Sequence, residues 1–169
     1  MTYCAEGEFR HADERGEGGI LQKGWVQHTT VGRGMWHSEI NNRPDMPMRF
    51  IQMWFLPTAP NLAPSVEQMK VKISERTNRF LPLVSNTHKG ALQIHSQGRV
   101  FSCFLQSGQE VSHQLEADWG AYLYLLEGGL IEVDNKAVSV YGSAMIRDQL
   151  GFDITARGDS ELVLVEVKL

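Results

Sequence analysis

The sequence lacks any excess of positive charge. Its 169 residues contain 16 lysines and arginines against 20 aspartates and glutamates, which gives a formal net charge of −4 and a pI near 5.8. Proteins that bind nucleic acid or an anionic membrane surface through charge carry a basic field. We therefore expect neither a nucleic-acid partner nor a membrane partner.

Long apolar runs and secretion signals are also missing. No stretch reaches the roughly 20 apolar residues that a membrane-spanning helix needs. The first six residues, MTYCAE, do not have the pattern of a signal peptide. The only two cysteines, Cys4 and Cys103, form no CxxC pair. They are interpreted as buried strand residues in a reducing cytoplasm, with a single disulfide between them as the alternative.

The sequence motifs of several enzyme classes are absent. There is no G-x-S-x-G elbow, no P-loop and no dinucleotide-binding G-x-G-x-x-G. Six histidines occur, but none of them form a His-x-His pair.

Short strands separated by turn residues dominate the second half of the chain. The pattern predicts strands over residues 91–94, 100–105, 110–115, 119–127, 130–133, 137–141, 143–146, 152–156 and 161–167. Many short strands at such spacing are typical of a sandwich or jelly-roll barrel. The fold is therefore predicted to be all-β, with very little helix.

The first half of the chain is predicted to contain longer connections. The expected elements are a strand end and turn at 3–9, a hairpin loop at 11–19, strand, turn and strand at 20–30, a loop at 41–48, a strand at 49–56 and a proline-rich linker at 57–64. Residues 66–76 are predicted to form a strand, with a short helix as the alternative.

An internal repeat predicts two barrels of one kind. Residues 3–9 (YCAEGEF) resemble residues 124–130 (YLLEGGL), and a hairpin and a further glycine follow each copy. The expected domains are residues 1–64 and residues 65–169. Strands precede the second copy but not the first, so the first barrel is expected to be truncated and the second complete.

Residues 28–39 (HTTVGRGMWHSE) contain the strongest candidate site. Two glycines, Gly32 and Gly34, break a strand, and a second strand then carries His37 and Glu39. Residues at i and i+2 of a strand point to the same face. An imidazole and a carboxylate together suit iron, zinc, manganese or nickel. The competing interpretation is a His-x-Glu pair without a metal, since two ligands are fewer than the four or more that a metal needs.

The segment Thr30-x-Gly-Arg-Gly-x-x-His-Ser-Glu39 resembles the second metal motif of the pirin family, which are two-domain cupins. Residues 49–57, with a Gln-x-Trp pattern and a closing proline, resemble the strand that follows it. The resemblance implies a bicupin of double-stranded β-helix (jelly-roll) type, with His37 and Glu39 as ligands of a divalent metal, usually iron. The family's first two ligands are an upstream His-x-His pair, so the ligand set here is expected to be incomplete.

The remaining polar candidates are weaker. By the cupin pattern Gln27 points into the first barrel, which sends His28 outward and leaves it a secondary ligand candidate. His11 is expected on a solvated loop. His113 falls where a cupin places its first ligand, but Leu115 occupies the next histidine position. The second barrel is therefore expected to be metal-free, with a structural His113.

Two functions are weighed. The resemblance implies either a metal-dependent quercetin 2,3-dioxygenase, with Glu39 as the catalytic base that takes the flavonol proton, or a non-catalytic binding or assembly module. The missing ligand pair favours the second, with weak or absent dioxygenase activity. A homodimer through the N-terminal half and a small aromatic ligand are the expected partners. The rival is a monomer in which the loops at residues 41–48 and 57–64 cover the open side of the truncated first barrel. Trp25, Trp36, Met53 and Trp54 are the expected cavity lining.

Overall fold

A computed structural model of the protein describes residues 1–14, 16 and 18–169. Within them the chain is nearly all-β, as predicted. The strands are β1 (Thr2–Glu6), β2 (Glu8–Asp13), β3 (Gly18–Gln22), β4 (Val26–Thr30), β5 (His37–Asn41), β6 (Arg49–Gln52), β7 (Ser65–Met69), β8 (Leu81–Val84), β9 (Gly98–Leu105), β10 (Glu110–Gln114), β11 (Trp119–Gly128), β12 (Ile131–Val133), β13 (Lys136–Val138), β14 (Ser143–Ile146), β15 (Gly151–Ala156) and β16 (Ser160–Lys168). One 3-10 helix, η1 (Ile73–Glu75), stands between β7 and β8.

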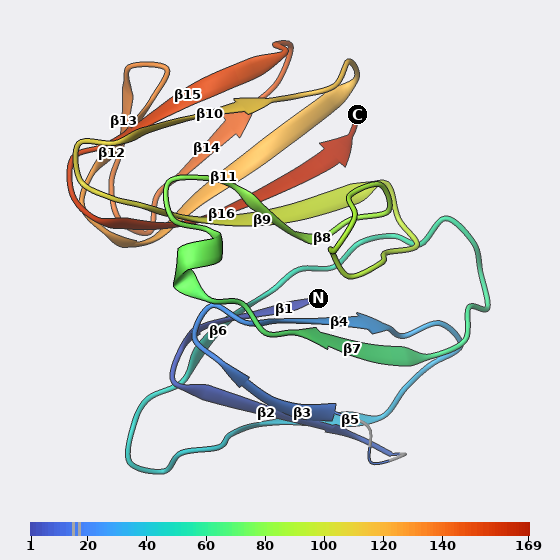
Figure 1. The fold of residues 1–169 in the computed structure, drawn as a ribbon. Helices are drawn as coiled ribbons and strands as arrows, with labels where there is room; N and C mark the ends of the chain where they lie inside the picture. The colour runs from blue at the N-terminus through green and yellow to red at the C-terminus, as the bar shows by residue number, and fades with distance from the viewer. Residues whose placement is uncertain (15, 17) are drawn as a thin grey trace.

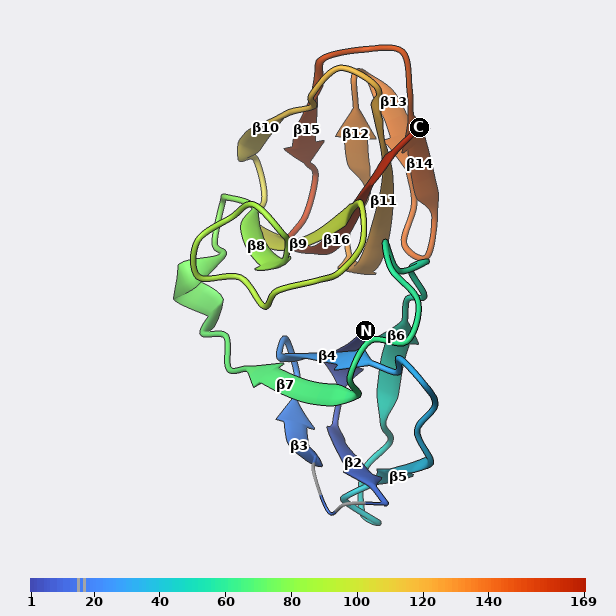
Figure 2. The same cartoon turned by 90° about the vertical axis from the view of Figure 1, so that its right-hand side faces the viewer.

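The strands form two sandwiches that lie one above the other (Figure 1). The first sandwich pairs the sheet β6-β1-β4-β7 with the sheet β3-β2-β5. The second pairs β14-β11-β16-β9-β8 with β10-β15-β12-β13. The chain passes from one to the other through η1, and the N-terminus lies on the side of the first sandwich that faces the second (Figure 2).

Because β7 pairs with β4, residues 65–69 belong to the first sandwich. The domain boundary at 64/65 and the truncation of the first barrel remain predictions.

The second sandwich matches the predicted strands closely. Alternation explains its core: Ala121, Leu123 and Leu125 of β11 point inward, whereas Tyr122 is exposed on the opposite face. The predicted strand over 91–94 is wrong, since Leu92 makes only an isolated bridge to Val84.

The internal repeat has a glycine at the same position in both copies, Gly7 and Gly128. Gly7 follows β1 and has φ +72°, and Gly128 ends β11 with φ +102°. A Cβ on Gly7 would lie 2.3 Å from the Pro47 carbonyl oxygen, and one on Gly128 would lie 1.8 Å from that of Asp159. Each copy therefore needs glycine at the same turn, both for its backbone conformation and for the close approach of another segment.

A second hydrophobic cluster packs the two sandwiches together. It contains Tyr3 and Val26 from the first sandwich and Leu83, Val100 and Val163 from the second. A buried polar triad lies in the same contact. The Tyr3 hydroxyl and the Arg76 guanidinium both donate to Oε1 of Glu161, and the Arg76–Glu161 distance is 2.5 Å.

Burial, together with the negative charge of Glu161, raises the pKa of Tyr3 well above its usual value. The phenol therefore stays protonated and remains the donor in its contact with Glu161. In this way the triad connects β1 and the segment after η1, which carries Arg76, to β16.

The cysteines and the lengths of the helices were also predicted from the sequence. Cys4 and Cys103 are both buried and lie on strands, as predicted, and they are not bonded to each other. Among the described residues, no helix is long and apolar enough to span a membrane.

Candidate functional site

The glycine motif shapes the loop that leads into the site. β4 ends at Thr30, and Gly32 follows with φ +55°. A Cβ at Gly32 would lie 2.0 Å from the Leu62 carbonyl oxygen, so glycine is required where these two loops meet. The chain then re-enters the sandwich as β5, which begins at His37.

The strand register brings the predicted ligand pair to one face. In β5, His37 is opposite Asp13 and Glu39 is opposite His11 on β2. Residues that face each other across paired strands share a side of the sheet. Nε2 of His37 lies 3.7 Å from Oε1 of Glu39, and the Gln52 amide donates to the same oxygen at 2.8 Å. The predicted convergence of His37 and Glu39 is therefore present in the geometry, while their role in binding metal remains a prediction.

The prediction for His11 was wrong. It lies within β2, not in a loop, and only 2% of its surface is exposed. Its ring centroid is 5.2 Å from that of His37, and its Nδ1 has no hydrogen-bond partner among the residues that the structure describes. Burial, reinforced by the charge of His37, lowers the pKa of His11. An uncharged imidazole therefore stands beside the His37–Glu39 pair.

Gln27 and His28 occupy opposite faces of β4. Gln27 is buried, accepts a hydrogen bond from the Gln68 amide at 2.9 Å and does not line the cavity described below. His28 points out of the first sandwich, as predicted, but the second sandwich covers that side. Only 6% of its surface is exposed.

A cavity of about 400 Å³ connects these groups. One part of its wall is formed by His11, His37, Glu39 and Gln52, and another by His28, His95 and Ser96. The lining also includes apolar side chains: Met35, Met53, Trp54, Phe55, Leu62 and Ile94. The predicted lining is half right, because Trp36 is 82% exposed and Trp25 packs into the hydrophobic clusters instead.

A complete metal centre does not fit these side chains. Among the described residues, no group of three or more histidine, cysteine, aspartate or glutamate side chains is placed to hold a metal ion. His37 and Glu39 offer one nitrogen and one oxygen ligand, and stable sites use four or more donors. Any ion held by this chain alone would therefore bind weakly.

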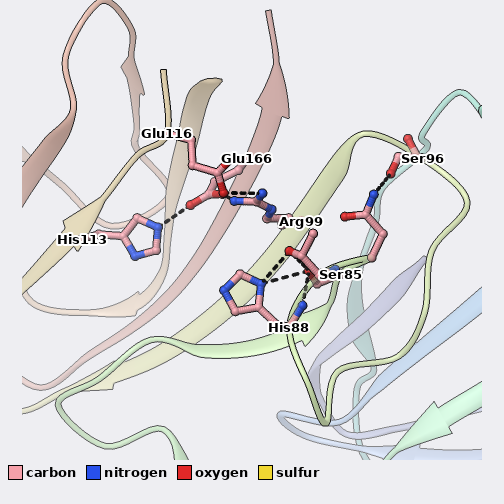
Figure 3. Close-up of polar contacts among 9 residues, drawn as sticks. Ser85, His88, Ser96, Arg99, His113, Glu116 and Glu166 are labelled. Atoms are coloured by element: carbon pink, nitrogen blue, oxygen red, sulfur yellow. Dashed lines mark hydrogen bonds and ion pairs between the residues drawn. The ribbon is translucent and has the colours of Figure 1, made fainter. Parts of the chain in front are cut away.

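A separate polar cluster lies in the second sandwich (Figure 3). Nε2 of His113 contacts Oε1 of Glu166, and the Arg99 guanidinium bonds Glu166 at 3.3 Å and Glu116 at 2.6 Å. The rings of Phe80, Phe101 and Phe152 surround His113. These contacts are of the structural kind predicted for His113.

Acid is expected to destabilise the protein through His28. Burial, with smaller effects from the Met1 amine and His95, lowers the pKa of His28 from 6.5 to about 4. The unfolded chain therefore binds more protons between these values, and stability is lost as the pH falls from 6.5 towards 4. We expect His28 to account for about 1–2 kcal/mol of the loss between pH 7.5 and pH 5.

Urea unfolding of the wild type and of His28→Gln at the two pH values measures this contribution. The variant should lose less stability on acidification than the wild type. Equal losses in both proteins would contradict the neutral, buried state of His28.

The fold and the site define a two-sandwich β protein with a histidine- and carboxylate-lined cavity. A family model described as Pirin matches residues 1–55, and one described as the quercetinase C-terminal cupin domain matches residues 83–167. A pirin-like protein of Caulobacter vibrioides is 32% identical over 98% of this chain and 72% of its own length. The chain therefore belongs to the pirin family, as the sequence resemblance implied.

Two further comparisons agree with this assignment. A protein of Escherichia coli named quercetin 2,3-dioxygenase is 24% identical over 99% of this chain and 71% of its own length. The crystal structure of the bacterial pirin YhhW from Escherichia coli in complex with nickel(II) superposes with a TM-score of 0.88 at 23% identity, covering 99% of this chain and 71% of that one. The structural similarity confirms the cupin fold class.

Proposed function

We propose that this chain is a pirin-family binding module that holds a small aromatic ligand in the cavity beside His37 and Glu39. The observation that supports it most is the cavity itself: about 400 Å³, with both apolar side chains and polar groups in its lining. Small-molecule sites have this composition and a volume of roughly 300–1,000 Å³. Trp54 and Phe55 offer flat faces to an aromatic ring, and Glu39 offers an acceptor for a phenolic hydroxyl.

The metal in this proposal is secondary. A divalent ion, with iron as the expectation from the family, would contact His37 and Glu39. Because these side chains do not form a complete ligand set, the ion would exchange readily and position a substrate poorly. We expect dioxygenase activity to be weak or absent for the same reason.

Metal analysis and quercetin binding test the proposal together. Purified protein should contain less than one equivalent of iron or nickel, and His37→Ala should lower the remaining metal at least about tenfold. Quercetin should quench the fluorescence of the wild type, while the flavonol itself is not consumed under air. Absence of quercetin binding would contradict the binding module.

The alternative function is a metal-dependent dioxygenase of quercetin 2,3-dioxygenase type. It is supported by the carboxylate of Glu39, which faces the cavity and could take the flavonol proton as a general base, and by the named relative from Escherichia coli. Stoichiometric metal with rapid, metal-dependent quercetin consumption would favour this function over the binding module.

We also propose that the chain forms a homodimer through its N-terminal half. β5 is an edge strand of its sheet, and the side chain of Ile40 on it is 49% exposed. Trp36 and Trp54 nearby are 82% and 87% exposed. Open strand edges and large apolar patches favour association with a second chain.

Light scattering coupled to gel filtration tests the dimer. The mass at micromolar concentration should be twice the 19.1 kDa of one chain. Ile40→Lys, which places a charge on the edge strand, should shift the protein towards the monomer. A single-chain mass for the wild type would rule the dimer out and favour the rival, in which the 41–48 and 57–64 loops cover the opening.

The cytoplasm is the proposed location. The buried, unbonded state of Cys4 and Cys103 supports it, because thiols persist in a reducing compartment.

A further inference from the structure

His28 is the buried polar side chain that the proposed function leaves without a role. It projects from β4 towards the second sandwich, on the same face as Val26, which packs in the cluster between the sandwiches. The side chain lines the cavity together with His95 and Ser96 of the loop before β9. His28 therefore lies where the cavity crosses from one sandwich to the other.

The imidazole of His28 has no hydrogen-bond partner in the part of the chain that the structure describes. Only 6% of the residue is exposed, yet its Nδ1 accepts and donates no hydrogen bond among the described residues. Buried polar groups nearly always have a partner, and an unpaired one in a cavity wall is an unused recognition group. Burial lowers the pKa of His28 to about 4, so near neutral pH the ring offers one donor and one acceptor nitrogen.

The surroundings of His28 differ from those of the His37–Glu39 pair. His11, His37 and Glu39 interact with one another electrostatically, whereas the charges that act on His28 are those of the Met1 amine and of His95 in the second sandwich. The two groups also project from different sheets of the first sandwich. Both groups line the same cavity, together with apolar side chains such as Met53 and Phe55. The Met1 amine interacts electrostatically with His28 and with Glu39. His28 therefore adds a further polar position to the cavity, on the side of the second sandwich.

We propose that His28 forms a second subsite, between the two sandwiches, which hydrogen-bonds a hydroxyl group of the aromatic ligand. The proposal rests on the binding function proposed above and adds the residue that selects among ligands. A ligand with a hydroxyl at this position satisfies the imidazole, whereas one of the same shape without it leaves the imidazole unpaired. The chain therefore discriminates hydroxylated from unsubstituted aromatic rings.

The test compares two probes of similar shape by calorimetry at pH 7: 2-naphthol, and 2-fluoronaphthalene, which lacks the hydroxyl. In the wild type the ratio of the two affinities should favour 2-naphthol by about tenfold more than in His28→Phe. His28→Gln, which keeps an acceptor and a donor, should retain part of the preference. His88→Gln serves as the control, since His88 bonds Ser85 outside the cavity and should leave the ratio unchanged.

The outcomes separate the two proposals. If both probes bind and the affinity ratio is the same in the wild type, His28→Phe and His28→Gln, the His28 subsite is refuted and the binding cavity stands. If neither probe nor quercetin binds the wild type, the binding module itself is refuted. A loss of preference in a correctly folded His28→Gln as well as in His28→Phe would support the subsite and show that it needs an imidazole.

Discussion

Glu161→Ala is expected to lower the free energy of unfolding by about 3–5 kcal/mol, the loss that follows when one partner of a buried ion pair is removed. Glu161 is 5% exposed and Arg76 is 3% exposed. Among the described residues, Glu161 is the only carboxylate in ion-pair contact with Arg76. The substitution would leave a guanidinium charge in the contact between the sandwiches without compensation.

The same substitution also removes the acceptor of Tyr3, which is fully buried on β1. A buried hydroxyl without a partner adds about 1–3 kcal/mol of desolvation cost. Because Tyr3 belongs to the first sandwich and Glu161 to the second, the loss should loosen the packing of one sandwich against the other.

Urea unfolding at pH 7 measures the effect, with Glu67→Ala as the matched control. Glu67 is an exposed glutamate on β7, so its replacement should change stability by no more than about 0.5 kcal/mol. Glu161→Gln, which keeps an acceptor for Tyr3 but not the charge, should fall between the two. A change below about 1 kcal/mol in Glu161→Ala would mean that the triad does not hold the sandwiches together.

The fold was predictable from the sequence where apolar runs are bounded by clear turn signals. β11 and β16 are long apolar runs that are buried over most of their length, and their turns carry glycine and aspartate, so local signals agree with the tertiary structure. β8 was missed because its sequence, LPLV, contains a proline, which argues against a strand. It is tolerated there because β8 is an edge strand.

The candidate site was predictable only in part. His37 and Glu39 share a face because they are two residues apart on one strand, which the sequence shows directly. His11 was missed because its segment is polar and glycine-rich, and such composition predicts a loop. Its burial comes from pairing with β5, a contact between segments about 28 residues apart. For His28, local alternation predicted the direction of the side chain, but it carries no information on the second sandwich, which covers that face.

The interior of the second sandwich provides the other large expected effect. Glu166 is 1% exposed and contacts both His113 and Arg99 (Figure 3). We expect Glu166→Ala to cost about 2–4 kcal/mol, slightly less than Glu161→Ala, because Arg99 retains a second carboxylate. That carboxylate is Glu116, at 2.6 Å, and the guanidinium also lies 3.9 Å from the Trp119 ring centroid.

Removing both carboxylates distinguishes this explanation from simple loss of packing. The loss of stability in the double variant Glu166→Ala/Glu116→Ala should exceed the sum of the losses in the two single variants by about 0.5–3 kcal/mol. The reason is that only the double variant leaves Arg99 without an anionic partner. Glu132→Ala is the control, because its pair with Arg157 is exposed and should contribute at most about 1 kcal/mol. Strict additivity in urea unfolding would show that Glu116 does not compensate Arg99. The loss of stability in Glu166→Ala would then come from His113. This imidazole would lose its hydrogen-bond acceptor while it remains surrounded by Phe80, Phe101 and Phe152.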